Sequence, residues 1–281
     1  MQNFIKKIIS KAIGFFINCL SYTFPDKALV MAYGFFSEPR AGKLLPNNLP
    51  EILKEAKKEI IDYGLEKFQT YIWQGNSTKI LLVHGWESNA ARWERLIKRL
   101  KLSGSTIIAL DAPAHGLSSG TVFDIPTYSE FIHELSKVYQ PTIIIGHSMG
   151  AVATAFYQFK YGQKNLEKLI LLGSPSDFNV LMQNYVSKLG LNSKIYLLIM
   201  QFVKNKFEIN TDLFTSANFL QKTTISGLII HDLHDDVVAF SEAEKIASSW
   251  KNAQFISTEN LGHSMHDDNL NSKIYNFLFE R

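Results

Sequence analysis

Short, continuous apolar runs recur along the chain, and a stretch with helical spacing follows most of them. Runs of this kind are typical of strands that are buried on both faces of a sheet. They lie at residues 79–83, 106–110, 142–145, 169–172 and 228–230, and another strand is expected at residues 254–257. Two further strands are expected at residues 59–63 and 67–73, with Gly64 in the turn between them.

Helical spacing fills the intervals between these runs. Helices are expected at residues 90–101, at 127–139, directly after Gly150, at 241–250 and from about residue 268. Strands that alternate with helices of this length form a mostly parallel sheet with helices on both faces, so we expect an α/β fold. In such sheets ligands bind at the carboxyl ends of the strands.

One long stretch, at about residues 175–226, breaks this alternation. It contains helical patterning at residues 178–189 and 193–207. Interruptions of this length inside a compact domain are usually lids or inserted subdomains, so we expect a helical cap insertion. Its apolar side chains either line an acyl pocket or pack the helical layer, and both interpretations stay open here. These side chains are Tyr185, Leu189, Tyr196, Leu198, Met200, Phe202 and Phe207.

The N-terminal segment has an apolar helical face with lysine and serine opposite. The apolar positions are Phe4, Ile5, Ile8, Ile9, Ala12 and Phe16. We expect this amphipathic helix to dock on the protein's own core. A membrane-surface anchor formed by residues 1–24 is the main alternative, and a signal peptide is disfavoured because Asn18 interrupts the apolar run. With a second helix at 27–36, residues 1–50 are expected to form a helical extension and residues 51–281 the main domain.

Composition narrows the classes of partner. The 281 residues are enough for one domain with an insertion, and the formal net charge is only +3. No basic cluster interleaved with aromatics is present, so nucleic acid is excluded as a partner. Cys19 is the single cysteine, which excludes an internal disulfide and a cysteine-based zinc site. We expect a cytoplasmic protein, with membrane association left open.

The candidate chemistry starts at Gly146-His147-Ser148-Met149-Gly150, between the run at 142–145 and a helix. A serine between two glycines in a strand–turn–helix can be held in a strained, exposed conformation, and neighbouring backbones there leave no room for a Cβ. The helix N-terminus also favours developing negative charge. The alternative is an ordinary glycine-rich turn.

Two later turns, also at carboxyl ends of strands, contain an acid and a base. Asp235 follows the run at 228–230, and His263 follows the strand expected at 254–257, which gives the chain order Ser, Asp, His. We expect Ser148 to be the nucleophile, His263 the base that takes its proton, and Asp235 the carboxylate that orients the imidazole. Other candidates remain open, and any of the acids could instead cap a helix. They are Asp236, Asp232 and Asp177 for the acid, and His266 and His234 for the base.

Together with His84-Gly85-Trp86 and the segment from Asp111 to Ser118, these motifs resemble the α/β-hydrolase superfamily over roughly residues 59–281. The resemblance implies an oxyanion hole formed by the backbone N–H groups of Trp86 and Met149, with Trp86 and His147 contacting the substrate. It also implies that Asp111 and His115 belong to a structural loop. Asp232 departs from the pattern, because relatives often have glycine there.

These features predict a serine hydrolase that cleaves carboxylic esters through an acyl-enzyme. Within acyl transfer, a thioesterase or a lysophospholipase-type hydrolase remains possible, and the apolar insertion favours lipid-like substrates. A non-catalytic binding module is the alternative of another class. The histidine pairs at 231 and 234 and at 263 and 266 do not have a standard zinc spacing, so we expect neither a metal nor a cofactor.

Overall fold

The computed structural model describes residues 2–280, with side chains from residue 8 onward. Contacts between Cα atoms divide the chain into two compact units. The helical unit comprises residues 1–38 and 177–215, and the sheet unit comprises residues 39–176 and 216–281. The division thus groups the N-terminal helices with the insertion. The boundaries expected from the sequence, at residue 50 and at about 175–226, stay predictions.

The sheet unit contains one eight-stranded sheet. Its strand order is β1-β2-β4-β3-β5-β6-β7-β8. Strands β1 and β2 pair antiparallel, as do β2 and β4, and all the other pairs are parallel. The α/β fold expected from the sequence is therefore confirmed. The strands are β1 (Lys57–Tyr63), β2 (Glu66–Trp73), β3 (Asn76–Val83), β4 (Ser105–Leu110), β5 (Ile143–His147), β6 (Lys168–Leu172), β7 (Ser226–Asp232) and β8 (Ala253–Thr258).

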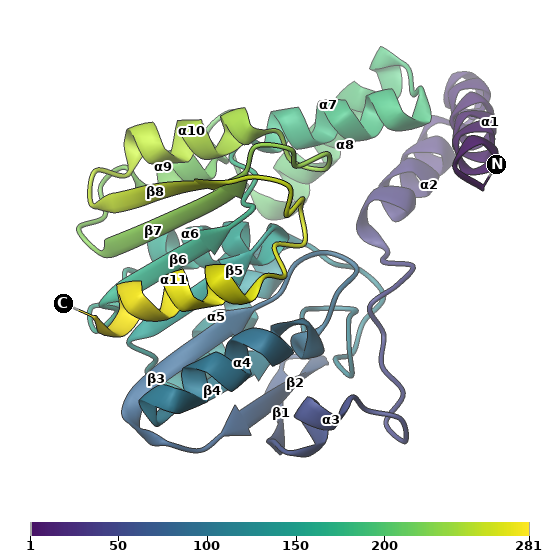
Figure 1. Cartoon of the computed structure of the whole chain (residues 1–281). Helices are drawn as coiled ribbons and strands as arrows, with labels where there is room; N and C mark the ends of the chain where they lie inside the picture. Colours follow the sequence, from purple (N-terminus) through teal and green to yellow (C-terminus); the bar gives the residue numbers. More distant parts are fainter. Residues whose placement is uncertain (1, 281) are drawn as a thin grey trace. The chain divides into compact units, whose positions relative to one another are not determined.

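Helices cover both faces of this sheet (Figure 1). Helices α4 (Glu94–Leu100) and α11 (Asp268–Phe279) pack against each other on one face. Helices α5 (Ile125–Tyr139), α6 (Met149–Tyr161), α9 (Ser216–Leu220) and α10 (Phe240–Ser249) form the layer on the other. The remaining elements are short: α3 (Glu51–Lys54) and the 3-10 turns η1 (Ala90–Trp93) and η2 (Lys101–Ser103).

The central strands are buried on both faces, as their continuous apolar runs indicate. Every residue of β4 and β5 is buried. The parallel register aligns the strand ends: Val83 of β3 pairs with Gly146 of β5, and His147 pairs with Leu172 of β6. The turns after these strands therefore meet at one edge of the sheet.

The helical unit has a core of its own. It is built from α1 (Gln2–Thr23), α2 (Pro25–Ser37), α7 (Phe178–Leu189) and α8 (Ser193–Phe207). The seven apolar side chains whose role the sequence left open pack here: Leu189 belongs to this core and the other six pack against it. The Phe202 ring lies 4.8 Å from Tyr33, and the Tyr185 ring lies 5.2 Å from Phe36. These side chains therefore pack the helical layer.

Helix α1 docks on its own unit through the face opposite to the expected one. Ile17 and Ser21 are fully buried, whereas Ile8, Ile9 and Phe16 are more than half exposed. Gly14 lies so close to α7 that an added Cβ would be 1.9 Å from the carbonyl oxygen of Leu189. The expectation that the apolar face contacts the protein core is thus wrong for these three residues and for Ala12, which is also exposed. Phe4 and Ile5 lie outside the described side chains.

Candidate active site

Ser148 lies in the sharp turn between β5 and α6. Its φ of 52° and ψ of −123° are in a region that a residue with a side chain rarely adopts. The flanking glycines allow this turn: a Cβ on Gly146 would lie 2.6 Å from the Cα of Ala151, and one on Gly150 would lie 2.3 Å from the carbonyl oxygen of His84. The steric reason expected for the glycines is confirmed.

His263 and Asp235 meet Ser148 at the carboxyl edge of the sheet. His263 follows β8 and Asp235 follows β7, so the in-register strand ends bring both turns next to the turn after β5. The Nε2 atom of His263 lies 2.9 Å from the Ser148 Oγ, and its Nδ1 atom lies 2.7 Å from the Asp235 Oδ2. The three side chains form one continuous hydrogen-bonded chain.

Asp235 is held as an anion by several donors. Its Oδ1 accepts hydrogen bonds from the backbone N–H groups of Val237 and Val238, at 2.8 and 2.9 Å. Burial alone would raise the pKa of this carboxyl, but the hydrogen bonds from His231, His263 and the two amides lower that pKa well below its usual range. An ionised Asp235 can only accept, so the Nδ1 of His263 carries the proton and its Nε2 is free to accept the proton of the Ser148 hydroxyl.

The competing acids and bases have other contacts. Asp232 accepts from the Thr258 hydroxyl at 2.8 Å and from the backbone N–H groups of Leu261 and His234, both at 3.0 Å, so it shapes the turn. Asp177 caps α7 in the helical unit by accepting from the Asn179 N–H. Asp236, His234 and His266 are exposed. Of the sequence candidates, the structure brings Asp235 and His263 to Ser148.

The two expected oxyanion donors flank the serine. Trp86 follows β3, and Gly85 packs so tightly that an added Cβ would lie 2.8 Å from the Ser148 Cβ. Met149 begins α6, where a helix has no internal acceptor for its amide. Within residues 2–280, neither the Trp86 nor the Met149 backbone N–H donates to a backbone oxygen outside the regular helix and strand bonds. The Trp86 ring is partly exposed and lies edge-on to the Phe123 ring, at 5.4 Å.

The segment from Asp111 to Ser118 holds the turns in place, as expected. The buried Asp111 carboxylate accepts from the backbone N–H groups of Ala90 and Leu117 and from the Tyr71 hydroxyl. His115 accepts from the Glu87 N–H at 2.9 Å through its Nε2. Both residues are fully buried, and neither bonds to Ser148.

The buried His115 makes folding sensitive to acid. Burial lowers its pKa from 6.5 to about 4. The unfolded chain therefore binds more protons between these two values, so the contribution of His115 to the free energy of unfolding is fully present above pH 6.5 and is lost as pH falls through about 4. At pH 4 we expect a loss on the order of 3 kcal/mol from this group. Urea unfolding at several pH values should show a smaller acid loss for His115→Gln than for the wild type; equal losses would contradict this reasoning.

His147 and Arg92 hold the backbone at His263 and Ser264, a role that the sequence did not indicate. The His147 Nε2 donates to the carbonyl oxygen of His263 at 2.8 Å, and the Arg92 Nη2 donates to that of Ser264 at 2.9 Å. Burial, together with the nearby Arg92 and His263, lowers the pKa of His147 well below its usual value, so its ring is neutral. The contacts of His147 and Trp86 with the substrate stay predictions.

We expect His147 to act by positioning His263. His147→Leu removes one buried hydrogen bond and should lower kcat about tenfold with little change in KM. His147→Gln can still donate from a similar position and should recover part of the loss. Steady-state kinetics of both variants check this, with the exposed His234→Leu as the control. Equal kcat for wild type and His147→Leu would contradict a positioning role.

His231 supports Asp235 in a way that the sequence analysis missed. Its Nε2 lies 3.4 Å from the Asp235 Oδ2 and 2.9 Å from the Val238 carbonyl oxygen. The sequence signal for this role was a histidine near the end of β7, the strand that precedes Asp235. The sequence contains no such signal for Arg92, because this residue lies in η1, far from His263 in the chain.

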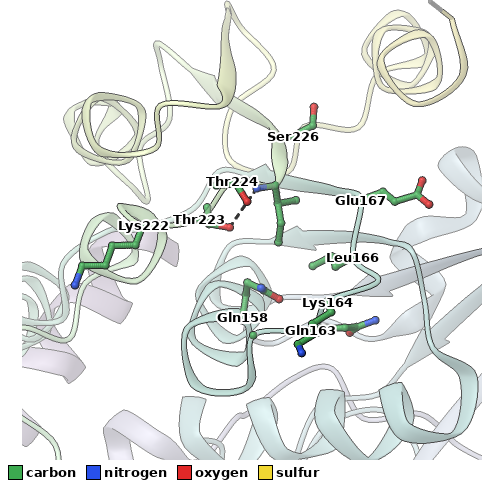
Figure 2. A pocket seen from close by; sticks show the side chains of 11 residues that line it. Gln158, Gln163, Lys164, Leu166, Glu167, Lys222, Thr223, Thr224 and Ser226 are labelled. Atoms are coloured by element: carbon green, nitrogen blue, oxygen red, sulfur yellow. Dashed lines mark hydrogen bonds between the residues drawn. The ribbon is translucent and has the colours of Figure 1, made fainter.

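Other features of the sheet unit lie away from this site. A cavity of about 610 Å³ opens at the amino ends of β6 and β7, whereas Ser148 lies at the carboxyl end of β5. Figure 2 shows its polar lining, which includes Gln163, Glu167 and Lys222. Among the described residues, no group of three or more histidine, cysteine or acidic side chains could hold a metal ion.

Parts of this chain are similar to proteins that are named as hydrolases. A serine hydrolase-like protein from Homo sapiens is 33% identical over 102 residues, and a monoacylglycerol lipase from Mycolicibacterium smegmatis is 29% identical over 91 residues. The alignments cover 34% and 29% of this chain, and 49% and 32% of those proteins. The chain thus spans no more than about half the length of these relatives.

A solved structure shares the fold at low sequence identity. The thioesterase domain from the curacin biosynthetic pathway has a TM-score of 0.60 and 15% identity, and the match covers 79% of this chain and 99% of that domain. The family model Hydrolase_4, described as serine aminopeptidase, S33, matches residues 75–216, just over half of the chain. The chain therefore belongs to this family of α/β-hydrolases.

Proposed function

We propose that this α/β-hydrolase cleaves carboxylic esters through an acyl-enzyme. The observation that carries the proposal is the hydrogen-bonded chain from the Ser148 Oγ through His263 to Asp235, with distances of 2.9 and 2.7 Å. A serine hydroxyl is a weak nucleophile near neutral pH, and a neutral imidazole with a free Nε2 can take its proton during attack.

In the first step, the Ser148 Oγ attacks the ester carbonyl carbon while its proton passes to the His263 Nε2. The ionised Asp235 stabilises the imidazolium that forms. The carbonyl oxygen becomes negative, and the backbone N–H groups of Trp86 and Met149 donate to it. Each such donor is worth on the order of 3 kcal/mol of barrier.

The tetrahedral intermediate then collapses. The bond to the leaving alcohol breaks, and His263 returns the proton to the departing oxygen, which leaves an acyl group on Ser148. A water molecule gives a proton to His263 and attacks the acyl carbon, and the reverse proton transfer restores the serine hydroxyl. The acid product leaves, and all protons are balanced over the cycle.

The acyl group itself is open within this proposal. The names of relatives include a monoacylglycerol lipase and a thioesterase domain, which supports testing lipid-like esters and thioesters. The seven apolar side chains named for the insertion give no argument for a lipid, because they pack in or against the core of the helical unit. The family description names a serine aminopeptidase, so a peptide-like substrate belongs in the same test.

A substrate panel tests this proposal. We expect hydrolysis of nitrophenyl esters over some range of acyl length, with the optimum length defining the acyl class, and little cleavage of aminoacyl nitroanilides. An acyl thioester of the optimum length separates esterase from thioesterase preference. Folded protein that cleaves none of these substrates would favour a non-catalytic binding module and would contradict the proposal.

A further inference from the structure

Helix α1 is attached to its unit by a polar edge. The Asn18 side chain donates to the Gly190 carbonyl oxygen at 2.8 Å and accepts from the Asn192 N–H at 2.8 Å. The Lys11 ammonium donates to the Ser187 carbonyl oxygen at 2.7 Å. With the close packing at Gly14, these bonds to the end of α7 and the following loop fix the rotation of the helix about its axis.

The opposite side of α1 is apolar and faces solvent. We call it the outer α1 face; its residues recur at helical spacing from residue 8 to residue 22. Its large side chains are 52–72% exposed. Between residues 8 and 23, where the side chains of this helix are described, Lys11 is the one charged residue. The outer α1 face consists of Ile8, Ile9, Ala12, Phe15, Phe16, Cys19 and Tyr22.

Scattered exposed apolar residues are ordinary, but a continuous stripe along a helix indicates a surface that binds something apolar. A surface helix normally turns its apolar face to the core. Here the core contact is made by the other side, so the fold leaves the apolar face available. The helix does not have to fold on its partner, which removes the ordering cost that a disordered segment has on binding.

The helical unit, which contains this face, has a net positive charge. Helix α1 contains no acidic residue, and Lys27 and Lys194 lie 5.1 Å from the rings of Phe24 and Tyr22 respectively. The helical unit contains eight lysines and five acidic residues, whereas the sheet unit contains equal numbers of basic and acidic residues. The formal net charge of +3 is thus located in the helical unit.

We infer that the outer α1 face binds the surface of a membrane that contains anionic lipids. Apolar and aromatic side chains with lysines beside them match the boundary between acyl chains and negative headgroups, where a helix lies flat in the membrane plane. Among the described residues, no helix is long and apolar enough to cross a membrane. A second copy of the chain is a poorer occupant, because pairing two such faces would bring lysines of like charge together.

The single cysteine gives a direct probe of this contact. Cys19 is exposed on the outer α1 face, so a polarity-sensitive dye attached to it reports transfer of the face from water into lipid. The probe protein is the full chain, mixed with vesicles of equal parts phosphatidylcholine and phosphatidylglycerol or of phosphatidylcholine alone. We expect a blue shift and co-sedimentation with the mixed vesicles, and both should weaken as salt is added.

Point variants test the face itself. In Phe15→Glu/Phe16→Glu, binding to the mixed vesicles should fall at least about tenfold, because two exposed aromatic side chains become charged. Phe159→Glu, in the sheet unit, is the matched control: Phe159 and Phe16 are both 56% exposed. Its binding should stay within about twofold of the wild type. Circular dichroism and urea unfolding check that each variant is folded.

Three outcomes would overturn the inference. Equal loss of binding in both variants would mean that the face is not specific, and no blue shift with either vesicle would mean that it does not enter lipid. Self-association without vesicles, lost in Phe15→Glu/Phe16→Glu, would assign the face to a second copy. Vesicle binding is measured without a substrate, so its failure is separate from failure of the proposed esterase activity.

Discussion

Replacing the Ser148 hydroxyl is expected to lower kcat/KM for the best nitrophenyl ester by about ten-thousandfold or more. In Ser148→Ala the acyl-enzyme cannot form, because no other described nucleophile is bonded to the His263 Nε2. What remains is the contribution of binding and of the oxyanion donors. The backbone turn is retained, since alanine has a Cβ in the same place as serine.

The matched control is Ser264→Ala. Ser264 is exposed and directly follows His263, and its backbone oxygen, which accepts from Arg92, is kept in the variant. Its kcat/KM should remain close to that of the wild type. Steady-state hydrolysis by purified, folded proteins is the measurement. If Ser148→Ala retained most of the wild-type rate, the nucleophile would lie elsewhere.

The second large effect is expected at Gly150, and it concerns folding. A Cβ at this position would lie 2.3 Å from the carbonyl oxygen of His84 and 2.4 Å from that of Val83, both of them backbone atoms at the end of β3. Helix α6 and strand β3 would have to separate. We expect Gly150→Ala to lower the free energy of unfolding by at least about 3 kcal/mol, or to prevent stable folding.

Gly162 at the end of the same helix provides the comparison. Its φ of +56° disfavours alanine, but an added Cβ would meet nothing within 4 Å. Gly162→Ala should therefore cost only about 1 kcal/mol, from backbone strain alone. Urea unfolding of the two variants measures the difference. Equal stabilities would show that close packing at Gly150 is not what requires glycine there.

Much of the architecture was predictable because its signals are local. The helices expected at 178–189 and 193–207 form with those bounds, since Asp177 and Asn192 cap their first turns and Gly190 ends α7 in the left-handed conformation. Strands β3 to β7 follow from short apolar runs that are largely buried. The strands expected at 59–63, 67–73 and 254–257 form as β1, β2 and β8. The short helix α9 was missed, because five residues are too few to show a period.

The N-terminal helix shows what periodicity alone could not give. The pattern identified an apolar face correctly, but it did not say which face makes the contact. Asn18, which interrupts the apolar run in the sequence, bonds to Gly190 and Asn192 and so attaches the helix to its unit. Which face of the helix makes the contact thus depends on a partner more than 170 residues away in the chain.

The same limit applies around the candidate site. Ser148, Asp235 and His263 could be predicted because each directly follows a strand whose carboxyl end lies at the same edge. Arg92 and His147 could not be given their role, because their partners are backbone oxygens of the His263 turn. Backbone acceptors leave no residue-type signal in a sequence.

The most direct test of the central claim is covalent labelling of Ser148. The folded wild type is reacted with a fluorophosphonate probe, its mass is measured, and the labelled peptide is identified. We predict one adduct, located on Ser148, formed much more slowly in His263→Ala and absent in Ser148→Ala. No adduct on the wild type, or equal labelling of Ser148→Ala, would contradict the proposal that this chain is a serine hydrolase.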